Sequence, residues 1–164
     1  MKQIILFFNL FITIACAIDL SDDVTDKIAE LLSMSRMDVE ICRNKTNTNI
    51  KDLMKMDELV DDDIMTTDIE KSALKVGCLF VCLLQRKDVM SGVHINVEKI
   101  KKIMDARMHL NFRLIAMRNQ ILDTCANHVK SKIDECEVIL KFYLCIIAEL
   151  QREENRRMTW YNGV

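Results

Sequence analysis

Apolar residues recur at helical spacing along most of this chain. The clearest case is the segment of roughly residues 68–84. Its apolar residues stand three or four positions apart, as on one face of an α-helix, and include Ile69, Ala73, Val76 and Phe80. The same spacing predicts four further helices over roughly residues 22–43, 49–60, 110–127 and 132–151, and another that begins near residue 97. No segment alternates as a strand would, so the pattern predicts an all-α fold of about six helices.

Local signals mark where some of these helices begin. Thr67 and Glu70 have the spacing of a capping box at the start of the clearest helix, and Ser131 is expected to cap the last one. Gly92 marks a loop between helices. From Val138 to Leu150 the last helix is apolar on nearly all sides, which indicates that other helices surround it. The chain contains no proline that would break any of them.

The first 17 residues have the layout of a cleaved signal peptide. Lys2 precedes the apolar stretch Ile4–Ile14, and the small residues of Ala15-Cys16-Ala17 follow it. The apolar stretch is too short to span a bilayer, which takes about 20 apolar residues. We therefore expect residues 1–17 to be a signal peptide and residues 18–164 to be one secreted domain, because single domains usually have roughly 100 to 200 residues.

Composition and charge narrow the kinds of partner. Removal of the signal peptide leaves 22 basic residues against 25 acidic ones, a net charge of −3. Nucleic acid is therefore not an expected partner, because binding to phosphates needs a basic face. The mature chain keeps only six aromatic residues but ten methionines. An interior built from Met, Leu and Ile would be soft and adaptable.

Cysteines carry the most information. After the signal peptide they stand at Cys42, Cys78, Cys82, Cys125, Cys136 and Cys145. An even number in an exported chain normally pairs into structural disulfides, so three bridges are expected. Cys78 and Cys82 point outward side by side from one helix face and cannot bond each other. Cys136 and Cys145 lie on opposite faces of the last helix and cannot either. Ten of the 15 connectivities that six cysteines allow stay open.

The cysteine spacing resembles that of the insect odorant-binding proteins, which include the pheromone-binding and general odorant-binding proteins of moths. It is Cys42-x35-Cys78-x3-Cys82-x42-Cys125-x10-Cys136-x8-Cys145, and the x3 and x8 gaps are nearly fixed in that family. This frame covers residues 42–145, most of the mature chain. The stretches Asp63-Ile64-Met65 and His94-Ile95-Asn96 are also similar to the moth branch.

The resemblance implies a fold, a disulfide pairing and a function. The fold would be about six helices around one apolar cavity, held by interlocked bridges Cys42–Cys82, Cys78–Cys136 and Cys125–Cys145. The function would be that of a secreted carrier that binds small hydrophobic odorants or pheromones in the cavity and delivers them through sensillar lymph to receptors, without chemistry. Further partners would be an odorant receptor or a second copy of the chain in a homodimer. No cofactor or metal is implied.

Alignment around the cysteines gives a candidate ligand-binding set. An aromatic pair of the family falls on Ile64 and Met65, and Leu84 stands where some pheromone binders place a serine. The hypothesis is a soft pocket for flexible aliphatic ligands with little polar discrimination. Its residues are Ile64, Met65, Phe80, Leu84, Leu114, Met117, Phe142 and Ile146. The alternative is that each of them is ordinary packed core, as helical apolar stripes usually are.

His94 is a candidate pH switch. Moth pheromone binders keep a histidine in the loop after the third cysteine, where its protonation loosens the pocket wall, and histidine titrates in the right range. The alternative is an exposed loop histidine with no switch. In those proteins an apolar tail enters the cavity, but residues 151–157 are nearly all polar here. We expect acid release to work through the His94 loop or through a lid of Met158, Trp160 and Tyr161.

Other motifs indicate no catalytic or metal site. The acidic residues between Asp57 and Asp63 lack the glycine and the ligand spacing of a calcium loop. Cys125-x2-His128 has ligand-like spacing but no second half, and the Gly-x-Ser-x-Gly elbow of hydrolases is absent. Asn44-Lys45-Thr46 is a candidate glycosylation site.

Three classes of function remain open beside each other. The leading one is the odorant or pheromone carrier, with a secreted carrier of other apolar ligands outside olfaction as its nearest alternative. A second class is a saposin-like protein or a phospholipase, but the tandem close-spaced cysteines and the His-Asp catalytic pair of such proteins are not seen in this sequence. A secreted signalling bundle would bind its receptor through the surface and have a filled core. Uptake of a fluorescent hydrophobic probe separates the carrier from the bundle.

Overall fold

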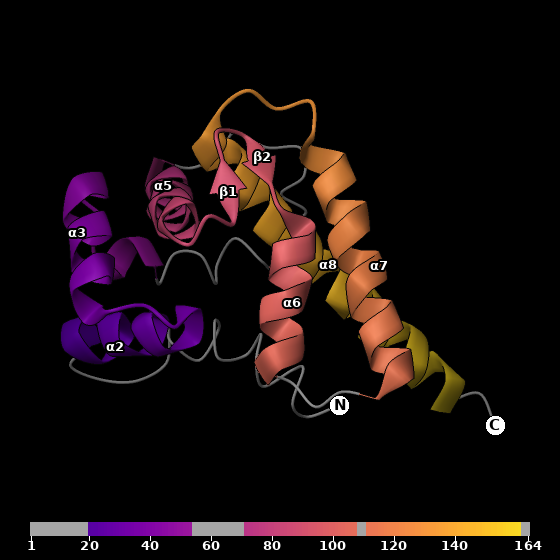
Figure 1. Ribbon diagram of the computed structural model, residues 1–164. Coiled ribbons are helices and arrows are strands. Elements are labelled where there is room, and N and C mark those ends of the chain that lie inside the picture. The colour runs from indigo at the N-terminus through magenta and orange to yellow at the C-terminus, as the bar shows by residue number, and fades with distance from the viewer. Residues whose placement is uncertain (1–19, 54–70, 108–110, 162–164) are drawn as a thin grey trace. The chain divides into compact units, whose positions relative to one another are not determined.

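The computed structural model describes residues 20–53, 71–107 and 111–161, and these are mostly helical (Figure 1). The helices are α2 (Leu20–Leu32), α3 (Arg36–Thr46), α5 (Lys71–Arg86), α6 (Val97–Arg107), α7 (Phe112–Val129) and α8 (Glu135–Tyr161), with a helical turn at residues 50–53. Two short strands, β1 (Met90–Ser91) and β2 (His94–Ile95), follow α5 in the sequence. The predicted all-α class is confirmed.

The described residues fall into two compact units, one that ends at Leu83 and one that begins at Leu84. Several predictions lie outside the described residues: the signal peptide, the larger part of the second helix, the capping box of Thr67 and Glu70, and the candidates Ile64 and Met65. Among the described helices, none is long and apolar enough to cross a membrane.

The predicted single helix over residues 22–43 is wrong, because the chain turns between α2 and α3. Ser33 lies in the left-handed region at φ 49°, and the Met34 N–H donates to the Ala29 carbonyl oxygen at 2.8 Å. This is the hydrogen bond of a Schellman motif, which satisfies carbonyl groups at the end of a helix. Asp88, at φ 52°, follows the end of α5 in the same motif.

Polar residues cap both ends of α3. At its start the Ser35 hydroxyl oxygen accepts the Asp38 N–H at 3.1 Å, which satisfies one of the free N–H groups of the first turn. At its end Asn47 adopts a left-handed conformation, and the Thr48 N–H donates to the Arg43 carbonyl oxygen at 3.2 Å. The serines and the asparagine therefore determine where the helices of the first unit stop and start.

The first unit is held by an apolar core and a disulfide. α2 and α3 pack crosswise against each other (Figure 1), and the Cys42–Cys82 disulfide joins α3 to α5. The buried residues of this core are Val24, Ile28, Ala29, Val39, Cys42, Leu79 and Leu83. They come from all three helices, so burial of these faces stabilises the helices together.

The helical turn at residues 50–53 is the start of the predicted second helix. The Asn49 N–H donates to Asp52 Oδ2 and the Asp52 N–H donates to Asn49 Oδ1, both at 3.0 Å, which is a reciprocal capping box. Asp52 is buried and faces the Lys75 ammonium of α5 at 3.7 Å. The Thr48 hydroxyl donates to the Lys75 carbonyl oxygen at 3.2 Å. These bonds tie the turn to α5.

The prediction that no strand forms is wrong over residues 90–95. β1 and β2 pair antiparallel, with Met90 opposite Ile95 and Ser91 opposite His94. Gly92, at φ 55°, opens the two-residue turn between them, a position that favours glycine. Strands of two residues are too short for alternation to reveal them in the sequence.

The second unit is built on α6, α7 and α8. The predicted helices near residue 97 and over 110–127 are confirmed as α6 and α7. Each has an asparagine cap: Asn96 Oδ1 accepts the Lys99 N–H and Asn111 Oδ1 accepts the Leu114 N–H, both at 3.0 Å. α7 and α8 pack along each other (Figure 1), and the Cys125–Cys145 disulfide joins them.

The predicted cap of the last helix is wrong. α8 begins at Glu135, and the side chain before it, Asp134, accepts the Glu137 N–H at 2.8 Å through Oδ1. Ser131 lies earlier in the connection. An aspartate is also the better cap electrostatically, because a negative charge is stabilised at a helix N-terminus.

α8 also continues beyond its predicted end near residue 151, to Tyr161. Arg152 and Arg156 pair with Glu149 and Glu153, one turn earlier, each at 2.6 Å. Glu, Gln and Arg are good helix formers, and such pairs add some stability on an exposed helix. The apolar pattern ends before the helix does.

Candidate functional site

The disulfides are the first feature that bears on function. The structure pairs Cys42 with Cys82 and Cys125 with Cys145, as the resemblance implied. Cys78 and Cys136 are disulfide-bonded as well. Each of the two units therefore has a bridge that joins helices within it.

Half of the candidate ligand-binding residues lie on the packed pair α7 and α8. Leu114, Phe142 and Ile146 are buried, and Met117 is partly buried. Phe142 and Ile146 are one helical turn apart on α8, and Leu114 and Met117 are nearly so on α7. The structure thus places four of the predicted residues on two helices that share a disulfide.

The other candidates are placed separately. Phe80 packs against the core of the first unit, and Leu84, near the end of α5, is partly buried. Ile64 and Met65 lie outside the described residues. A pocket formed by all eight residues stays a prediction.

His94, the candidate pH switch, is exposed and lies on β2, opposite Ser91. The sequence placed it in a loop, and the structure places it in the hairpin. The proposed lid residues Met158, Trp160 and Tyr161 belong to the last turns of α8. Their backbone is helical rather than an extended tail.

Asn44, the candidate glycosylation site, is exposed near the end of α3. The hydroxyl of Thr46, the third residue of its acceptor sequence, donates to the Cys42 carbonyl oxygen at 3.0 Å. It also lies 2.7 Å from the Thr48 hydroxyl oxygen. Glycosylation of Asn44 stays a prediction.

Arg118 on α7 is a buried charge that the sequence analysis missed. It is only 4% exposed and lies on the buried face of α7, between Leu114 and Leu122. The signal was present: in the helical stripe of Leu114, Arg118, Ile121 and Leu122, one member is charged. A charge at such a position is unusual, because burial of a charge needs a partner.

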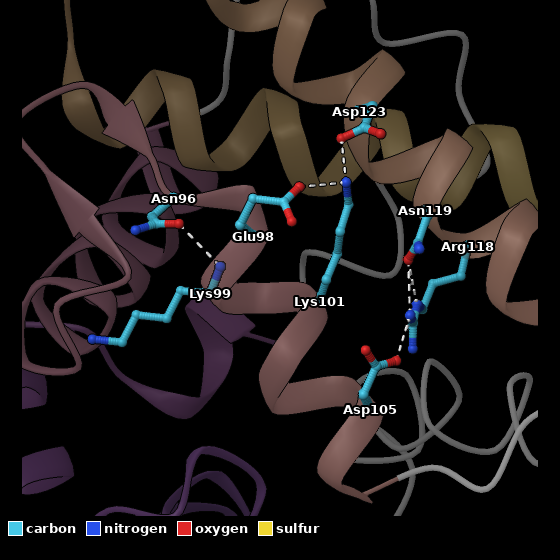
Figure 2. Close-up of polar contacts among 8 residues, drawn as sticks. All are labelled: Asn96, Glu98, Lys99, Lys101, Asp105, Arg118, Asn119 and Asp123. Atoms are coloured by element: carbon cyan, nitrogen blue, oxygen red, sulfur yellow. Dashed lines mark hydrogen bonds and ion pairs between the residues drawn. The ribbon is translucent and has the colours of Figure 1, made fainter.

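The guanidinium of Arg118 is paired on one side only (Figure 2). Nη2 lies 2.7 Å from Asp105 Oδ1 on α6 and 2.8 Å from Asn119 Oδ1, and Nε donates to the same Asn119 oxygen at 3.1 Å. Nη1 is buried and has no hydrogen-bond partner among the described residues. Asp105 is half exposed, so the ion pair joins a buried cation to an anion at the surface.

Ion pairs on the surface of the second unit shift three pKa values. The Lys101 ammonium donates to Asp123 at 2.8 Å and to Glu98 at 2.7 Å, and these bonds raise the Lys101 pKa (Figure 2). On α8, the bond from Lys141 lowers the pKa of Glu137 and raises that of Lys141. Each bond favours the charged form, so these residues act as structural ties at neutral pH.

No group of three or more His, Cys, Asp or Glu side chains in the described ranges is arranged to hold a metal ion.

The model of the PBP/GOBP family matches residues 24–149, which is more than half of the chain. This chain belongs to the PBP/GOBP family. The resemblance seen in the cysteine spacing is thereby confirmed.

Relatives of this PBP/GOBP chain include proteins named pheromone-binding protein Gp-9. Those of Solenopsis xyloni and Solenopsis geminata are each 24% identical over 148 residues, which is 90% of this chain and 92% of the relative. The protein of that name from Solenopsis globularia littoralis is 32% identical over 73 residues, 44% of this chain and 46% of its own length. No solved structure matches the chain.

The PBP/GOBP match covers a large part of each compact unit and all six disulfide-bonded cysteines. It also takes in Arg118, Asp105 and the described candidate pocket residues. It ends at Glu149, so the last turns of α8 lie beyond the matched region.

Proposed function

We propose that this chain is a secreted carrier that binds one small hydrophobic ligand of the odorant or pheromone kind in an internal cavity, transports it to receptors and catalyses no reaction. The observation that carries the proposal is the PBP/GOBP match over residues 24–149. The names of the Solenopsis relatives, which refer to pheromone binding, support a small apolar ligand for this chain too.

Secretion is supported by the disulfides, because structural bridges persist in oxidising compartments, and by the expected signal peptide over residues 1–17. We propose residues 18–164 as one odorant-binding domain, with Cys78–Cys136 as its third bridge. An odorant receptor or a second copy of the chain is the proposed partner beyond the ligand.

The apolar character of α7 and α8 supports a binding site that includes Leu114, Met117, Phe142 and Ile146. These residues offer hydrocarbon surface and a flexible thioether, which suit an aliphatic ligand. The sequence alone proposes Ile64, Met65, Phe80 and Leu84 as further lining residues. Transfer of the ligand's apolar surface out of water would drive binding.

Displacement of a fluorescent probe tests the proposal. The disulfide-bonded chain is titrated with N-phenyl-1-naphthylamine, and twelve-carbon ligands are then used to displace the probe. We expect saturable uptake at one site and displacement in the micromolar range, about −8 kcal/mol. A chain that takes up no probe would be a filled bundle, and the carrier proposal would then be wrong.

Two phenylalanines of the second unit provide a matched pair of variants. Phe142 is buried on α8, whereas Phe112, at the start of α7, is 86% exposed. Phe142→Leu is expected to weaken ligand affinity by about 10-fold, because apolar contact between the ring and the ligand would be lost, and Phe112→Leu is expected to leave it unchanged. Circular dichroism establishes that both variants fold. Equal effects of the two would remove Phe142 from the proposed site.

We extend the proposal to release of the ligand through His94. Protonation of His94 would add a positive charge to the hairpin that connects α5 and α6. His94→Gln is expected to reduce the loss of affinity between neutral and mildly acidic pH, with His128→Gln on α7, also exposed, as the control. An unchanged pH profile in His94→Gln would exclude the switch. Deletion of residues 158–164 tests the lid in the same assay, and ligand affinity that is unchanged at both pH values would exclude it.

A further inference from the structure

The nitrogens of the Arg118 guanidinium are unequally bonded. Arginine has five N–H donors and no acceptor. The edge formed by Nε and Nη2 is occupied by Asn119 Oδ1, and Nη2 also reaches Asp105 Oδ1 at 2.7 Å. The two donors of Nη1 are buried and have no partner among the described residues (Figure 2).

Such an arrangement is uncommon in a folded chain. Most buried polar groups have a hydrogen-bond partner, and one that lacks it reduces stability. The other buried polar residues of the described chain, Thr25, Thr48 and Asp52, each have a partner. Nη1 is therefore the exception, and it lies on the apolar face of α7, one turn after the candidate pocket residue Leu114.

We propose that Nη1 of Arg118 donates to the oxygen of a neutral carbonyl group on an otherwise apolar ligand, an aldehyde or an ester. This inference rests on the proposed function, which supplies an apolar ligand in the second unit. It also replaces the expectation of little polar discrimination. A carbonyl oxygen has two lone pairs and no proton, which suits a group that can only donate.

The charges around Arg118 favour a neutral ligand over a carboxylate. Asp105 already balances the charge of Arg118 at 2.7 Å, so a ligand carboxylate would bring a second negative charge beside that of Asp105. Lys101, one turn before Asp105 on α6, already bonds to Glu98 and Asp123 (Figure 2). The site thus needs an acceptor but no further charge.

The test is a displacement series in which only the head group changes. Twelve-carbon ligands ending as an aldehyde, a methyl ester, an alcohol, a carboxylate and an alkene are compared on the wild-type protein and on Arg118→Met. Methionine has a similar length but no donor. We expect the wild type to bind the aldehyde and the ester about 10-fold or more tightly than the alkene. In Arg118→Met this ratio should fall to about 2-fold or less, with affinity for the alkene retained.

Lys101→Met is the matched control, because it removes a cation from the same α6–α7 region while leaving Arg118 paired. Its head-group ranking should equal that of the wild type. If Arg118→Met weakened all five ligands by the same factor, Arg118 would have only a structural role and the inference would be wrong. The inference would also be wrong if the wild type bound the carboxylate best. It would be wrong as well if the wild type bound all five head groups equally, because solvent would then satisfy Nη1.

A second measurement needs no variant. The infrared stretch of a ¹³C-labelled ester carbonyl moves to lower frequency when the oxygen accepts a hydrogen bond. We expect such a shift for the ester bound to the wild-type protein, relative to the ester in hexane. A bound ester with the frequency seen in hexane would refute the role of Arg118 but leave the carrier proposal intact. A wild type that takes up neither probe nor ester would refute both.

Discussion

The two compact units treat their buried polar groups differently. In the first, Thr25, Thr48 and Asp52 are buried, and each accepts or donates a bond that caps a helix or ties two segments together. In the second, Arg118 is buried with one nitrogen unpartnered among the described residues. The fold alone explains the polar groups of the first unit. For Arg118 of the second unit, we propose that a ligand supplies the missing acceptor.

The largest expected effect on the first unit comes from loss of its disulfide. Cys42→Ala/Cys82→Ala should lower the free energy of unfolding by about 2 to 4 kcal/mol, because the bridge restrains the unfolded chain. The Cys125→Ala/Cys145→Ala pair should lower it by about 0.6 kcal/mol less, since its bridge spans 20 residues rather than 40. Urea denaturation followed by circular dichroism measures both. The reverse order would show that the second unit depends more on its bridge.

Replacing the buried polar groups compares the units directly. Asp52→Ala should lower the free energy of unfolding by about 2 kcal/mol, because the capping box and the bond to Lys75 are lost together, with the ranking of ligands unchanged. Arg118→Met should change it by less than about 1 kcal/mol, because an apolar side chain replaces an incompletely bonded charge. Thermal unfolding without ligand measures both values. A larger loss in Arg118→Met would make Arg118 a structural residue like Asp52.

The break between α2 and α3 offers a smaller test with opposite signs. Ser35→Ala should lower the free energy of unfolding by about 1 kcal/mol, because the cap of α3 is lost. Ser33→Gly should raise it by up to about 1 kcal/mol, because glycine adopts a left-handed conformation without strain. The midpoint of urea unfolding measures both. A lower midpoint for Ser33→Gly would contradict the role given to this turn.

The smallest effect concerns the ion pair of Glu137 and Lys141 in the second unit. The bond from Lys141 holds the pKa of Glu137 below its usual 4.5, so its stabilisation is present above that pH and is lost as the pH falls through the lowered pKa. The pKa of Lys141 is raised above 10.5, so the same stabilisation is lost again as the pH rises past it. The difference in melting temperature between wild type and Glu137→Gln should therefore be largest between these limits. A difference independent of pH would exclude the pair as its cause.

Periodicity predicted the parts of this fold that bury an apolar stripe. α5, α6 and α7 follow from residues such as Val76, Ile100 and Ile121, which recur at helical spacing. The ends of helices were harder to predict, because Ser33, Asn47 and Asp88 occupy the left-handed positions where glycine is the usual signal. The continuation of α8 beyond residue 151 was not predicted because residues 151–157 are nearly all polar, and ion pairs rather than an apolar stripe accompany them.

The candidate site was predicted in part. The cysteine spacing led to the family, and the apolar candidates Leu114, Phe142 and Ile146 are buried. The sequence shows the charge of Arg118 in an apolar stripe, but the role of this charge depends on which of its nitrogens are bonded. That property depends on the positions of Asp105 and Asn119 around it, and sequence spacing does not contain them.

The central claim, that this chain carries one small apolar ligand, is tested most directly by calorimetry. Titrating the disulfide-bonded protein with a twelve-carbon aldehyde at several temperatures should give saturation at one ligand per chain and a negative change in heat capacity, because apolar surface is buried. Heats that do not saturate, or a heat-capacity change of zero, would contradict the claim.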